Sequence, residues 1–445
     1  MDFGTSSVKI AILNENNETV QSVKKSYSYE VIDNDKIEIE PEKVFKALIR
    51  GLKEFETKYI KNIEVLVFDV FSPSLVILNE KGESLYPCIL HLDRRSRQQS
   101  RQIVREMGKE KYQNITGVLP FSGGVSLTSL LWVKENLPEI YQKTYKFGHF
   151  NTYIFQKLTG NWFIDSVNAS MMGIYETTTW GGWSEEIVKT FNLNLAKLPE
   201  IVEPGSLIGK LKKDMAEKMG LKSGLPVVFG SNDAATAILG AGNKNEGEIL
   251  NIAGSNEICT VLTEKPIVND AYYLRNSLYK NKWQIFSINI GGFAIEWFRE
   301  QMYKEMDKEY FYTEYLKDLI QNIDDIGKYK EATVKFKPYL AGDRHSLEKR
   351  RGSFTGLTLS TTREEMLLAI LIGIHEPVTK NINISREFLE LNQEIVVTGG
   401  LAESSYLDLK RKLFNKFSFK FQERCTTRGN GKLALEALNN ATLLD

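Results

Sequence analysis

Alternating and periodic apolar positions divide the first half of the chain into short strands and helices. The stretch VKIAIL (8–13) is typical of a strand, and ETVQSVKKSYSYEV (18–31) is typical of its hairpin partner. In PEKVFKALIRGLKEF (41–55) the apolar residues Val44, Leu48 and Leu52 share one helical face. The run EVLVFDVF (64–71) predicts one buried strand. This alternation of strands and helices predicts an α/β fold.

The pattern restarts in the second half of the chain. LNIAGSNEICTVL (250–262) resembles MDFGTSSVKIAIL (1–13), because both place a Gly-(Thr/Ser)-(Ser/Asn) tip between two β-rich runs. This similarity indicates an internal duplication at the level of the motif. A chain of 445 residues also exceeds the size of one hydrophobic core, which rarely grows past about 250–300 residues. We therefore predict two domains, residues 1–241 and residues 242–445.

Helices and strands continue on both sides of this boundary. The apolar spacing predicts helices in 126–144, interrupted at Pro138, and in 363–374, and a last helix in KLALEALNN (432–440). A strand followed by a double glycine is predicted in EIVVTGG (394–400).

Composition narrows the function classes. Lys plus Arg and Asp plus Glu number 57 each, so the formal net charge of zero gives no sign of a nucleic-acid partner. Three widely spaced cysteines, Cys88, Cys259 and Cys425, favour a reducing compartment over a disulfide framework. The longest apolar run, MLLAILIGI (366–374), is too short for a membrane span, and no signal peptide is recognisable. We expect a cytoplasmic protein without a membrane segment.

The most informative stretch for chemistry is PVVFGSNDAATAILGAG (226–242). It predicts a strand, a turn and a helix of small residues, with Asp233 at the mouth of that helix. A carboxylate in this place could act as a general base that takes the proton of an attacking hydroxyl. The same aspartate could equally be an ordinary helix N-cap. The spacing alone favours neither reading.

The two glycine turns are candidate phosphate sites. Thr5, Ser6 and the adjacent backbone N–H groups could bind phosphate oxygens, and Lys9 could add a positive charge. Asp2 is placed to hold Mg²⁺, which prefers few carboxylates and keeps waters. The same reasoning gives phosphate contacts to Gly254, Ser255 and Asn256. Each turn alone could be a plain β-turn, for which these residue types are favoured.

VVTGGLAESS (396–405) ends a predicted strand with Gly399 and Gly400. A backbone without side chains lets an adenine and its ribose approach closely. The alternative is an ordinary turn between a strand and a helix, with Ser404 in the first helical turn.

Several segments together resemble the FGGY carbohydrate kinases, the group of xylulose, ribulose, gluconate and glycerol kinases. The resemblance runs from Asp2 to about Leu438. It is carried by DFGTSSVK (2–9), LYPCILHLDRRS (85–96), LTGNWFIDSVNASMMGIYE (158–176), PYLAGDRHSLEKRRGSFTGL (338–357) and VVTGGLAESS (396–405). It implies two ribonuclease-H-like domains of the actin ATPase type flanking a cleft, the use of ATP and Mg²⁺, and closure of the domains over a sugar.

The resemblance also assigns roles to residues. It makes Asp233 the catalytic base and gives a metal role to Asp2 with Asp233. It implies substrate contacts for Ser72, Pro73, Asp93 and Asp233, although Ser72, Pro73 and Ser74 stand where xylulose kinases carry Met-His-Gly. ATP contacts fall to Thr5, Ser6, Lys9, Gly254, Ser255, Asn256, Gly292, Glu296, Gly399, Gly400, Leu401 and Ser404.

We therefore expect an ATP-dependent kinase that phosphorylates a hydroxyl of a small sugar, a pentulose such as xylulose or ribulose, and that can form a homodimer. One alternative is a non-catalytic relative that binds a sugar or a partner protein, suggested by the altered sugar pocket and by the single residue, Met1, that precedes Asp2. The presence of both Asp233 and Asp2 argues against this alternative, because a protein that only binds a ligand would not need them. Another is an actin-like ATPase of the chaperone or filament type, against which the sugar-kinase-like segments speak.

Overall fold

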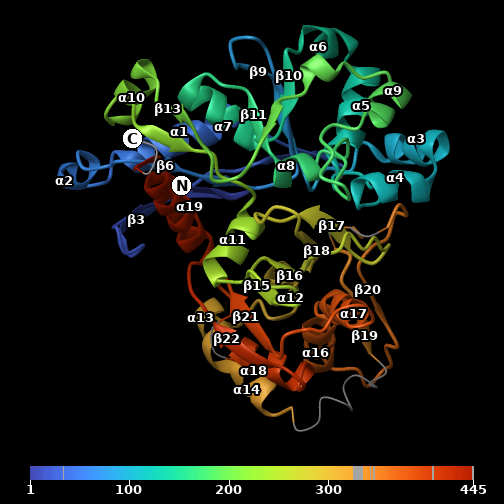
Figure 1. Cartoon of the computed structure of the whole chain (residues 1–445). Coiled ribbons are helices and arrows are strands. Elements are labelled where there is room, and N and C mark those ends of the chain that lie inside the picture. Colours follow the sequence, from blue (N-terminus) through green and yellow to red (C-terminus); the bar gives the residue numbers. More distant parts are fainter. Residues whose placement is uncertain (34, 324–333, 341, 344–345, 403–404, 443–445) are drawn as a thin grey trace.

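A computed structural model describes the chain except residues 34, 324–333, 341, 344–345, 403–404 and 443–445. Figure 1 shows two lobes, an upper lobe built from the first half of the chain and a lower one built from the second half. Helices α11 (Asp233–Ala241) and α19 (Cys425–Thr442) lie between them. Among the described strands, those up to Val228 pair with one another, and those from Ile249 onward pair with one another. The strands thus divide near residue 242, whereas α19, from the second half of the chain, packs against β6 and β14 of the upper lobe, so the domain boundary stays a prediction.

The upper lobe contains four sheets with the orders β3-β2-β1-β7, β10-β8-β9-β5-β4, β11-β12 and β13-β14-β6. Its strands are β1 (Asp2–Phe3), β2 (Ser7–Leu13), β3 (Thr19–Ser26), β4 (Glu30–Asp33), β5 (Lys36–Ile39), β6 (Leu66–Val67), β7 (Asp69–Val70), β8 (Ser74–Leu78), β9 (Ser84–Leu90), β10 (Lys146–Gly148), β11 (Phe163–Asp165), β12 (Glu200–Val202), β13 (Leu207–Lys210) and β14 (Pro226–Val228).

The lower lobe is organised around one sheet of order β17-β18-β16-β15-β21-β22, beside the small pair β19-β20. The strands are β15 (Ile249–Ala253), β16 (Asn256–Thr263), β17 (Tyr273–Asn276), β18 (Trp283–Ile290), β19 (Lys335–Lys337), β20 (Ser353–Thr355), β21 (Glu394–Thr398) and β22 (Ser418–Phe421).

Helices cover both lobes. Those of the upper lobe are α1 (Pro41–Leu52), α2 (Thr57–Ile60), α3 (Arg97–Met107), α4 (Lys109–Thr116), α5 (Ser126–Asn136), α6 (Pro138–Lys143), α7 (Phe150–Thr159), α8 (Ser166–Ser170), α9 (Glu185–Thr190), the 3₁₀ turn η1 (Leu195–Lys197) and α10 (Lys213–Met219). Those of the lower lobe are α12 (Gly292–Met302), α13 (Lys308–Tyr310), the π-helical turn η2 (Phe311–Tyr315), α14 (Leu316–Gln321), α16 (Arg363–Gly373), α17 (Glu376–Ser385) and α18 (Ser405–Leu413).

The predicted duplication is present in the strand arrangement. In the upper lobe β1 and β2 form an antiparallel hairpin, β2 pairs with β3, and β1 lies parallel to β7. In the lower lobe β15 and β16 form the equivalent hairpin, β16 pairs with β18, and β15 lies parallel to β21. The similarity of the two turns in sequence therefore corresponds to the same local topology.

The apolar run 64–71 was predicted as one strand, and this prediction is wrong in one respect. The run forms two short strands on either side of Phe68, because β6 pairs with β14 whereas β7 pairs with β1. Beside β6, a groove of about 390 Å³ separates Leu66 and Val67 from Ile12 and Leu13 of β2. The Met1 ammonium closes one end of this groove by donating to the Val67 carbonyl at 3.0 Å.

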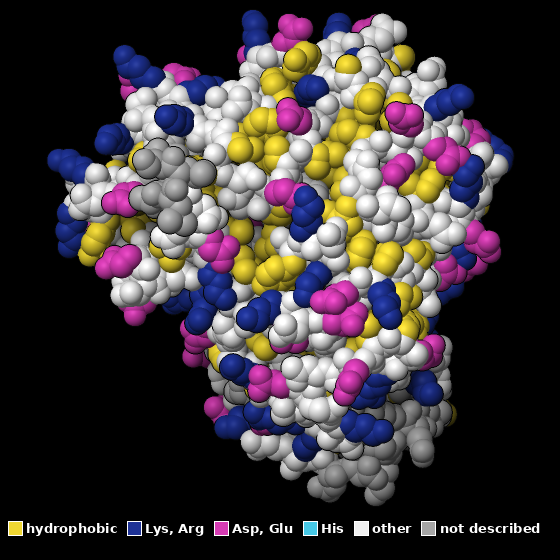
Figure 2. Space-filling model, in the orientation of Figure 1, with side chains coloured by type: hydrophobic (Ala, Val, Ile, Leu, Met, Phe, Trp, Pro, Cys, Tyr) yellow, Lys and Arg dark blue, Asp and Glu magenta, His cyan; other side chains and the backbone are white. Residues whose placement is uncertain are grey.

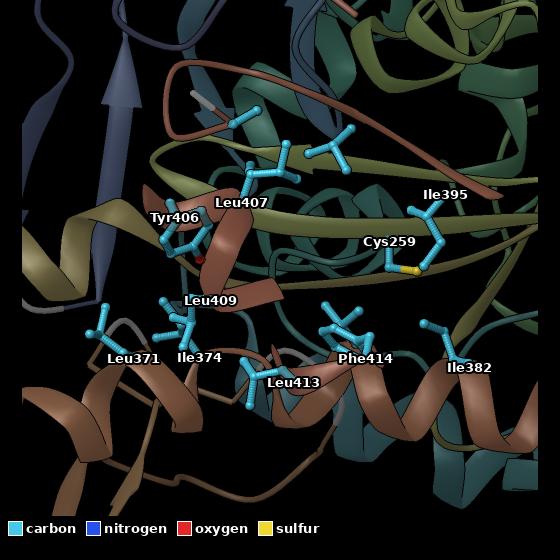
Figure 3. Packing of buried hydrophobic residues seen from close by; sticks show 14 of the residues in the cluster. Cys259, Leu371, Ile374, Ile382, Ile395, Tyr406, Leu407, Leu409, Leu413 and Phe414 are labelled. Atoms are coloured by element: carbon cyan, nitrogen blue, oxygen red, sulfur yellow. The ribbon is translucent and has the colours of Figure 1, made fainter. Parts of the chain in front are cut away.

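The core of the lower lobe packs helices against the six-stranded sheet. Figure 3 shows Cys259 and Ile395 from the sheet with Ile382 and Leu409 from the helices and Phe414 directly after α18. The core also holds a buried ion pair, since Lys410 of α18 contacts Glu257 of β16 and both side chains are almost fully buried. This ion pair therefore links helix α18 to the hairpin β15–β16.

Helices α11 and α19 cross in close contact. A Cβ atom on Gly240 would lie 1.7 Å from the Cys425 carbonyl oxygen, and one on Gly429 would lie 2.0 Å from that of Thr236. Only glycine fits at such an approach of two backbones. The crossing packs α19, at the end of the chain, against α11, which follows the first half of the chain.

The surface agrees with the balanced composition. Figure 2 shows basic and acidic side chains interspersed over the face it presents, without a large area of one sign. No helix in the described part of the chain combines the length and the apolar character that a membrane crossing requires.

Candidate active site

Three chain segments of the upper lobe run side by side in the same direction. In β1 and β7 Asp2 pairs with Asp69, and the Val70 N–H donates to the Ser231 carbonyl at 3.0 Å, so that β7 also lies parallel to the segment that leads to Asp233. Residues that follow the carboxyl ends of parallel strands meet at one edge of a sheet, where ligands bind in open α/β folds. The turn 4–6, Ser72 and Asp233 therefore share one edge.

Asp233 is the first residue of α11 and does not cap it. The side chain of Asn232 accepts the N–H groups of Ala234 and Ala235, so Asn232 is the N-cap. The alternative reading of Asp233 as an ordinary N-cap is therefore wrong. Asn232 holds the capping position, while Asp233 Oδ1 also accepts the Ala234 N–H at 2.7 Å, which leaves Asp233 Oδ2 available for chemistry.

Burial, followed by the charge of Asp2, raises the pKa of Asp233 to about 6. The Ala234 N–H, Arg275 and Lys9 act in the opposite direction. A general base works best when its pKa lies close to the pH of the reaction. The environment of Asp233 therefore suits the uptake of a proton from an alcohol near neutral pH.

A third carboxylate, Asp69, lies in this cluster, and sequence reasoning missed it. Its side chain is fully buried, and its pKa is raised by burial and by the charge of Asp2. Asn430 of α19 donates to Oδ2, whereas Oδ1 accepts no hydrogen bond within the described part of the chain. The only signal in the sequence was one acidic residue inside an otherwise apolar run.

The first glycine turn presents small polar groups at the same edge. The Gly4 N–H donates to the Ser7 carbonyl at 3.0 Å, which closes the turn, and Ser6 is exposed at its tip with Thr5 partly exposed beside it. Lys9 lies 3.6 Å from Asp2. Hydroxyls, backbone N–H groups and one cation can all bind phosphate oxygens.

The second glycine turn brings together most of the residues predicted to bind nucleotide in the lower lobe. The Gly292 N–H donates to the Gly254 carbonyl at 2.9 Å, and the Leu401 N–H donates to the Ala253 carbonyl at 3.0 Å. At Gly399, with φ +104°, a Cβ would lie 2.3 Å from the Ala253 carbonyl oxygen. The turn 254–256, the start of α12 and the turn after β21 therefore form one glycine-lined surface.

The hairpin β15–β16, which carries the second turn, packs against the helix that carries Asp233. Ile252 and Ile258, on the two strands of the second hairpin, pack in one apolar cluster with Ala234. Figure 1 shows β15 and β16 beside α11 at the junction of the lobes. The structure thus brings the hairpin of the second glycine turn and the helix of the candidate base to the same junction.

Some predicted residues have other partners. The Glu296 carboxylate accepts hydrogen bonds from Arg299, Lys308 and Tyr312, which lower its pKa to about 2. Ser404 lies outside the described residues. The roles of Glu296 and Ser404 in nucleotide binding stay predictions.

The substrate candidates in the upper lobe differ in exposure. Asp93 is buried, and its carboxylate binds the Arg95 guanidinium at 2.7 Å and the Ile37 N–H at 2.7 Å. Pro73 is buried, whereas Ser72 is partly exposed. Of these candidates Ser72 is therefore the best placed to contact a ligand, and the roles of Asp93 and Pro73 stay predictions.

The carboxylates also bear on the expected magnesium ion. Within the described ranges no set of three or more His, Cys, Asp or Glu side chains is arranged as a metal cage. Mg²⁺ in phosphoryl-transfer enzymes needs only one or two carboxylates, with waters and phosphate oxygens completing its shell. The pair Asp2 and Asp233 fits this requirement, and its role in holding Mg²⁺ stays a prediction.

The chain is similar to known sugar kinases over almost its whole length. It is 26% identical over 422 residues to a xylulose kinase from Staphylococcus xylosus, covering 93% of this chain and 85% of that protein. It is 27% identical over 419 residues to a gluconokinase from Bacillus licheniformis, covering 91% and 80%.

Solved structures show the same fold. The ligand-bound xylulose kinase from Lactobacillus acidophilus superposes with a TM-score of 0.87 at 22% identity, covering 99% of this chain and 89% of that one. The gluconate kinase from the same organism gives a TM-score of 0.85 at 22% identity, with the same coverage. The predicted two-domain actin-like ATPase fold is confirmed.

Residues 1–240 match the model of the N-terminal domain of the FGGY family of carbohydrate kinases. This match spans more than half of the chain and includes both the first glycine turn and Asp233. The chain belongs to the FGGY family of carbohydrate kinases, which are ATP-dependent phosphotransferases.

Proposed function

We propose that this kinase phosphorylates a hydroxyl of a small sugar, a pentulose such as xylulose or ribulose, with Asp233 as the catalytic base. The observation that carries the proposal is the meeting of the turn 4–6, Ser72 and Asp233 at one sheet edge, with the hairpin β15–β16, which carries the turn 254–256, packed against the helix of Asp233. The similarity to xylulose kinases supports the pentulose, and the similarity to gluconokinases keeps sugar acids in the test.

In the proposed reaction the sugar hydroxyl lies beside Asp233, and the γ-phosphoryl group of ATP lies between the two glycine turns. Asp233 accepts the hydroxyl proton as the new oxygen–phosphorus bond forms and the bond to the β-phosphate oxygen breaks. Backbone N–H groups of the two turns, with Lys9, stabilise the charge on the phosphate oxygens. Mg²⁺ held by Asp2 and Asp233 would neutralise part of that charge. Closure of the lobes would exclude water from the transfer.

The experiment is a coupled assay of ADP release with ATP, Mg²⁺ and a panel of ketoses, aldoses, polyols and sugar acids. We expect one pentulose to stimulate ADP release well above the rate without sugar. Stimulation by a sugar acid alone would retain the kinase and refute the pentulose. Absence of stimulation by every sugar, in a protein that still binds ATP, would favour the non-catalytic alternative.

A further inference from the structure

A chain of buried polar groups leads from Ser231, two residues before the candidate base, to the partly exposed Ser72. Its anchor is Asp165, which is fully buried before helix α8. Asp165 Oδ1 accepts the Ser231 hydroxyl at 2.7 Å and the N–H groups of Val167 and Asn168 at 3.1 Å. Asp165 Oδ2 accepts the side-chain amides of Asn151 at 2.7 Å and Asn168 at 2.6 Å. A carboxylate with five donors around it can only accept hydrogen bonds.

Asp165 fixes the orientation of the Asn168 side chain. The amide nitrogen of Asn168 must face Asp165, so its Oδ1 atom faces the opposite way and can only accept. Two groups meet this oxygen, namely His149 Nδ1 at 3.2 Å and the Ser72 hydroxyl. Both must therefore supply a proton to it.

The contact of His149 Nε2 supports the same assignment of hydrogen-bond donors. Its Nε2 atom lies 2.8 Å from the Ser126 hydroxyl, which can donate to it when the ring carries its proton on Nδ1. The ring is fully buried, and burial lowers the pKa of His149 to about 3, so the imidazole is neutral. The hydrogen-bond directions along Ser126, His149 and Asn168 are thus consistent with one another.

The consequence concerns Ser72. A serine hydroxyl has one proton to donate and two lone pairs that can accept. The proton of Ser72 is committed to Asn168, so a ligand meets only the lone pairs. Ser72 follows the carboxyl end of β7 and is partly exposed, whereas its neighbours Phe71 and Ser74 are buried.

We propose that Ser72 is a specificity-determining residue that accepts a hydrogen bond from a hydroxyl of the substrate. A sugar with a carbonyl or carboxylate oxygen opposite Ser72 would bind weakly, because two hydrogen-bond acceptors would face each other without a proton between them. The inference rests on the proposed function, because it assigns one contact within the proposed sugar site. It specifies the substrate as one with a free hydroxyl opposite Ser72.

The test compares analogues of the best sugar from the panel. A monodeoxy analogue lacks one hydroxyl, whereas the deoxyfluoro analogue at the same carbon keeps an acceptor of similar size and lacks the donor. Both series are assayed for kcat/KM with the wild type, Ser72→Ala, Ser72→Thr and the matched control Ser74→Ala. The Ser74 hydroxyl is buried, donates to the Phe71 carbonyl and accepts the Phe150 N–H.

We expect one carbon at which the deoxy and the deoxyfluoro analogues lose kcat/KM to the same extent in the wild type, about tenfold or more. With Ser72→Ala, kcat/KM for the parent sugar should fall by a similar factor, and kcat/KM for these two analogues should not fall further. Ser72→Thr should restore most of the kcat/KM for the parent sugar. Ser74→Ala should change kcat/KM by the same factor for every sugar. Full activity of every fluoro analogue, or an equal loss in Ser72→Ala with every sugar, would overturn the proposal.

The same cycle measured as sugar affinity by titration calorimetry requires no turnover. A chain that binds sugar but releases no ADP would refute the proposed function, and the calorimetric cycle would still decide the role of Ser72. Failure of the two proposals can therefore be distinguished.

Discussion

At the scale of single residues, Asp233 and the groups around it carry the proposed chemistry. Asn232 caps the helix, and burial with the Asp2 charge brings the pKa of Asp233 to about 6. An aspartate with this pKa and without a capping role is suited to proton transfer. Two predictions follow from this environment.

The substitution Asp233→Asn should remove the base while keeping the size of the side chain. We expect kcat/KM to fall by about 10²–10⁴-fold, the range of general base catalysis, while thermal stability and ATP affinity change little. The matched control is Asp214→Asn, which alters an exposed aspartate in the first turn of α10. Turnover close to that of the wild type in Asp233→Asn would remove the assignment.

The pH profile should report the same group. Asp233 must be ionised to accept a proton, so kcat/KM should fall as the pH drops below about 6 and level off above it. The profile is measured with saturating ATP and Mg²⁺ and limiting sugar. A rate that stays constant from about pH 5 to 8 would be incompatible with a base of this pKa.

The sequence was sufficient to locate Asp233 at the start of a helix and the two glycine turns between strands, because short motifs place these residues at predicted strand ends; their roles stay predictions. It was insufficient for Asp69, because one acidic residue in an apolar run gives no sign of its partners. The group that donates to Asp69, Asn430, lies 361 positions further along the chain. The chain from Asp165 to Ser72 is likewise made of contacts between distant segments.

At the scale of elements, hairpins and long helices were predicted well, and the strand 64–71 was not. Helices α1, α5, α6 and α16 follow the predicted apolar faces, and both glycine hairpins form as predicted. The run 64–71 divides because each part finds a different partner strand. Pairing between strands far apart in the sequence cannot be read from the hydrophobic pattern of one of them.

The groove between β2 and β6 should accept added strand residues. The register of β1 places residues added ahead of Met1 between Ala11–Leu13 and Val65–Val67. An engineered extension of four residues with alternating valines should stabilise the fold by about 1–3 kcal/mol, since it buries apolar side chains and removes the buried ammonium.

The matched control for this extension is four Gly-Ser residues, which offer backbone pairing with little apolar surface. Urea unfolding compares the free energies of both proteins with that of the original chain. Equal stability of all three would show that the groove does not accept a strand.

The buried ion pair between Lys410 and Glu257 in the lower lobe leads to a second prediction at this scale. Lys410→Met leaves the Glu257 charge buried without its cation, which should cost about 3–5 kcal/mol in unfolding free energy. The double variant Lys410→Met with Glu257→Leu should recover most of this loss, because it removes both charges. The account of the pair would fail if the single and double variants unfolded at the same urea concentration.

At the scale of the whole molecule, the proposed site draws on both lobes. The upper lobe contains the candidate base and the first glycine turn, and the lower lobe contains the glycine-lined surface. Composition and duplication predicted two domains, but the return of α19 to α11 was not predicted. Gly240 and Gly429 allow this close contact, but their role is recognisable only from the crossing of the two helices in the structure.

The central claim is that the γ-phosphoryl group of ATP passes to a sugar hydroxyl and not to water. Phosphorus NMR of a mixture of protein, ATP, Mg²⁺ and the best sugar of the panel measures this directly. We expect a sugar phosphate ester that grows in step with ADP, little inorganic phosphate, and ester formation slowed by about 10²–10⁴-fold with Asp233→Asn. Release of inorganic phosphate without an ester, at a rate independent of sugar, would contradict the account and favour an ATPase.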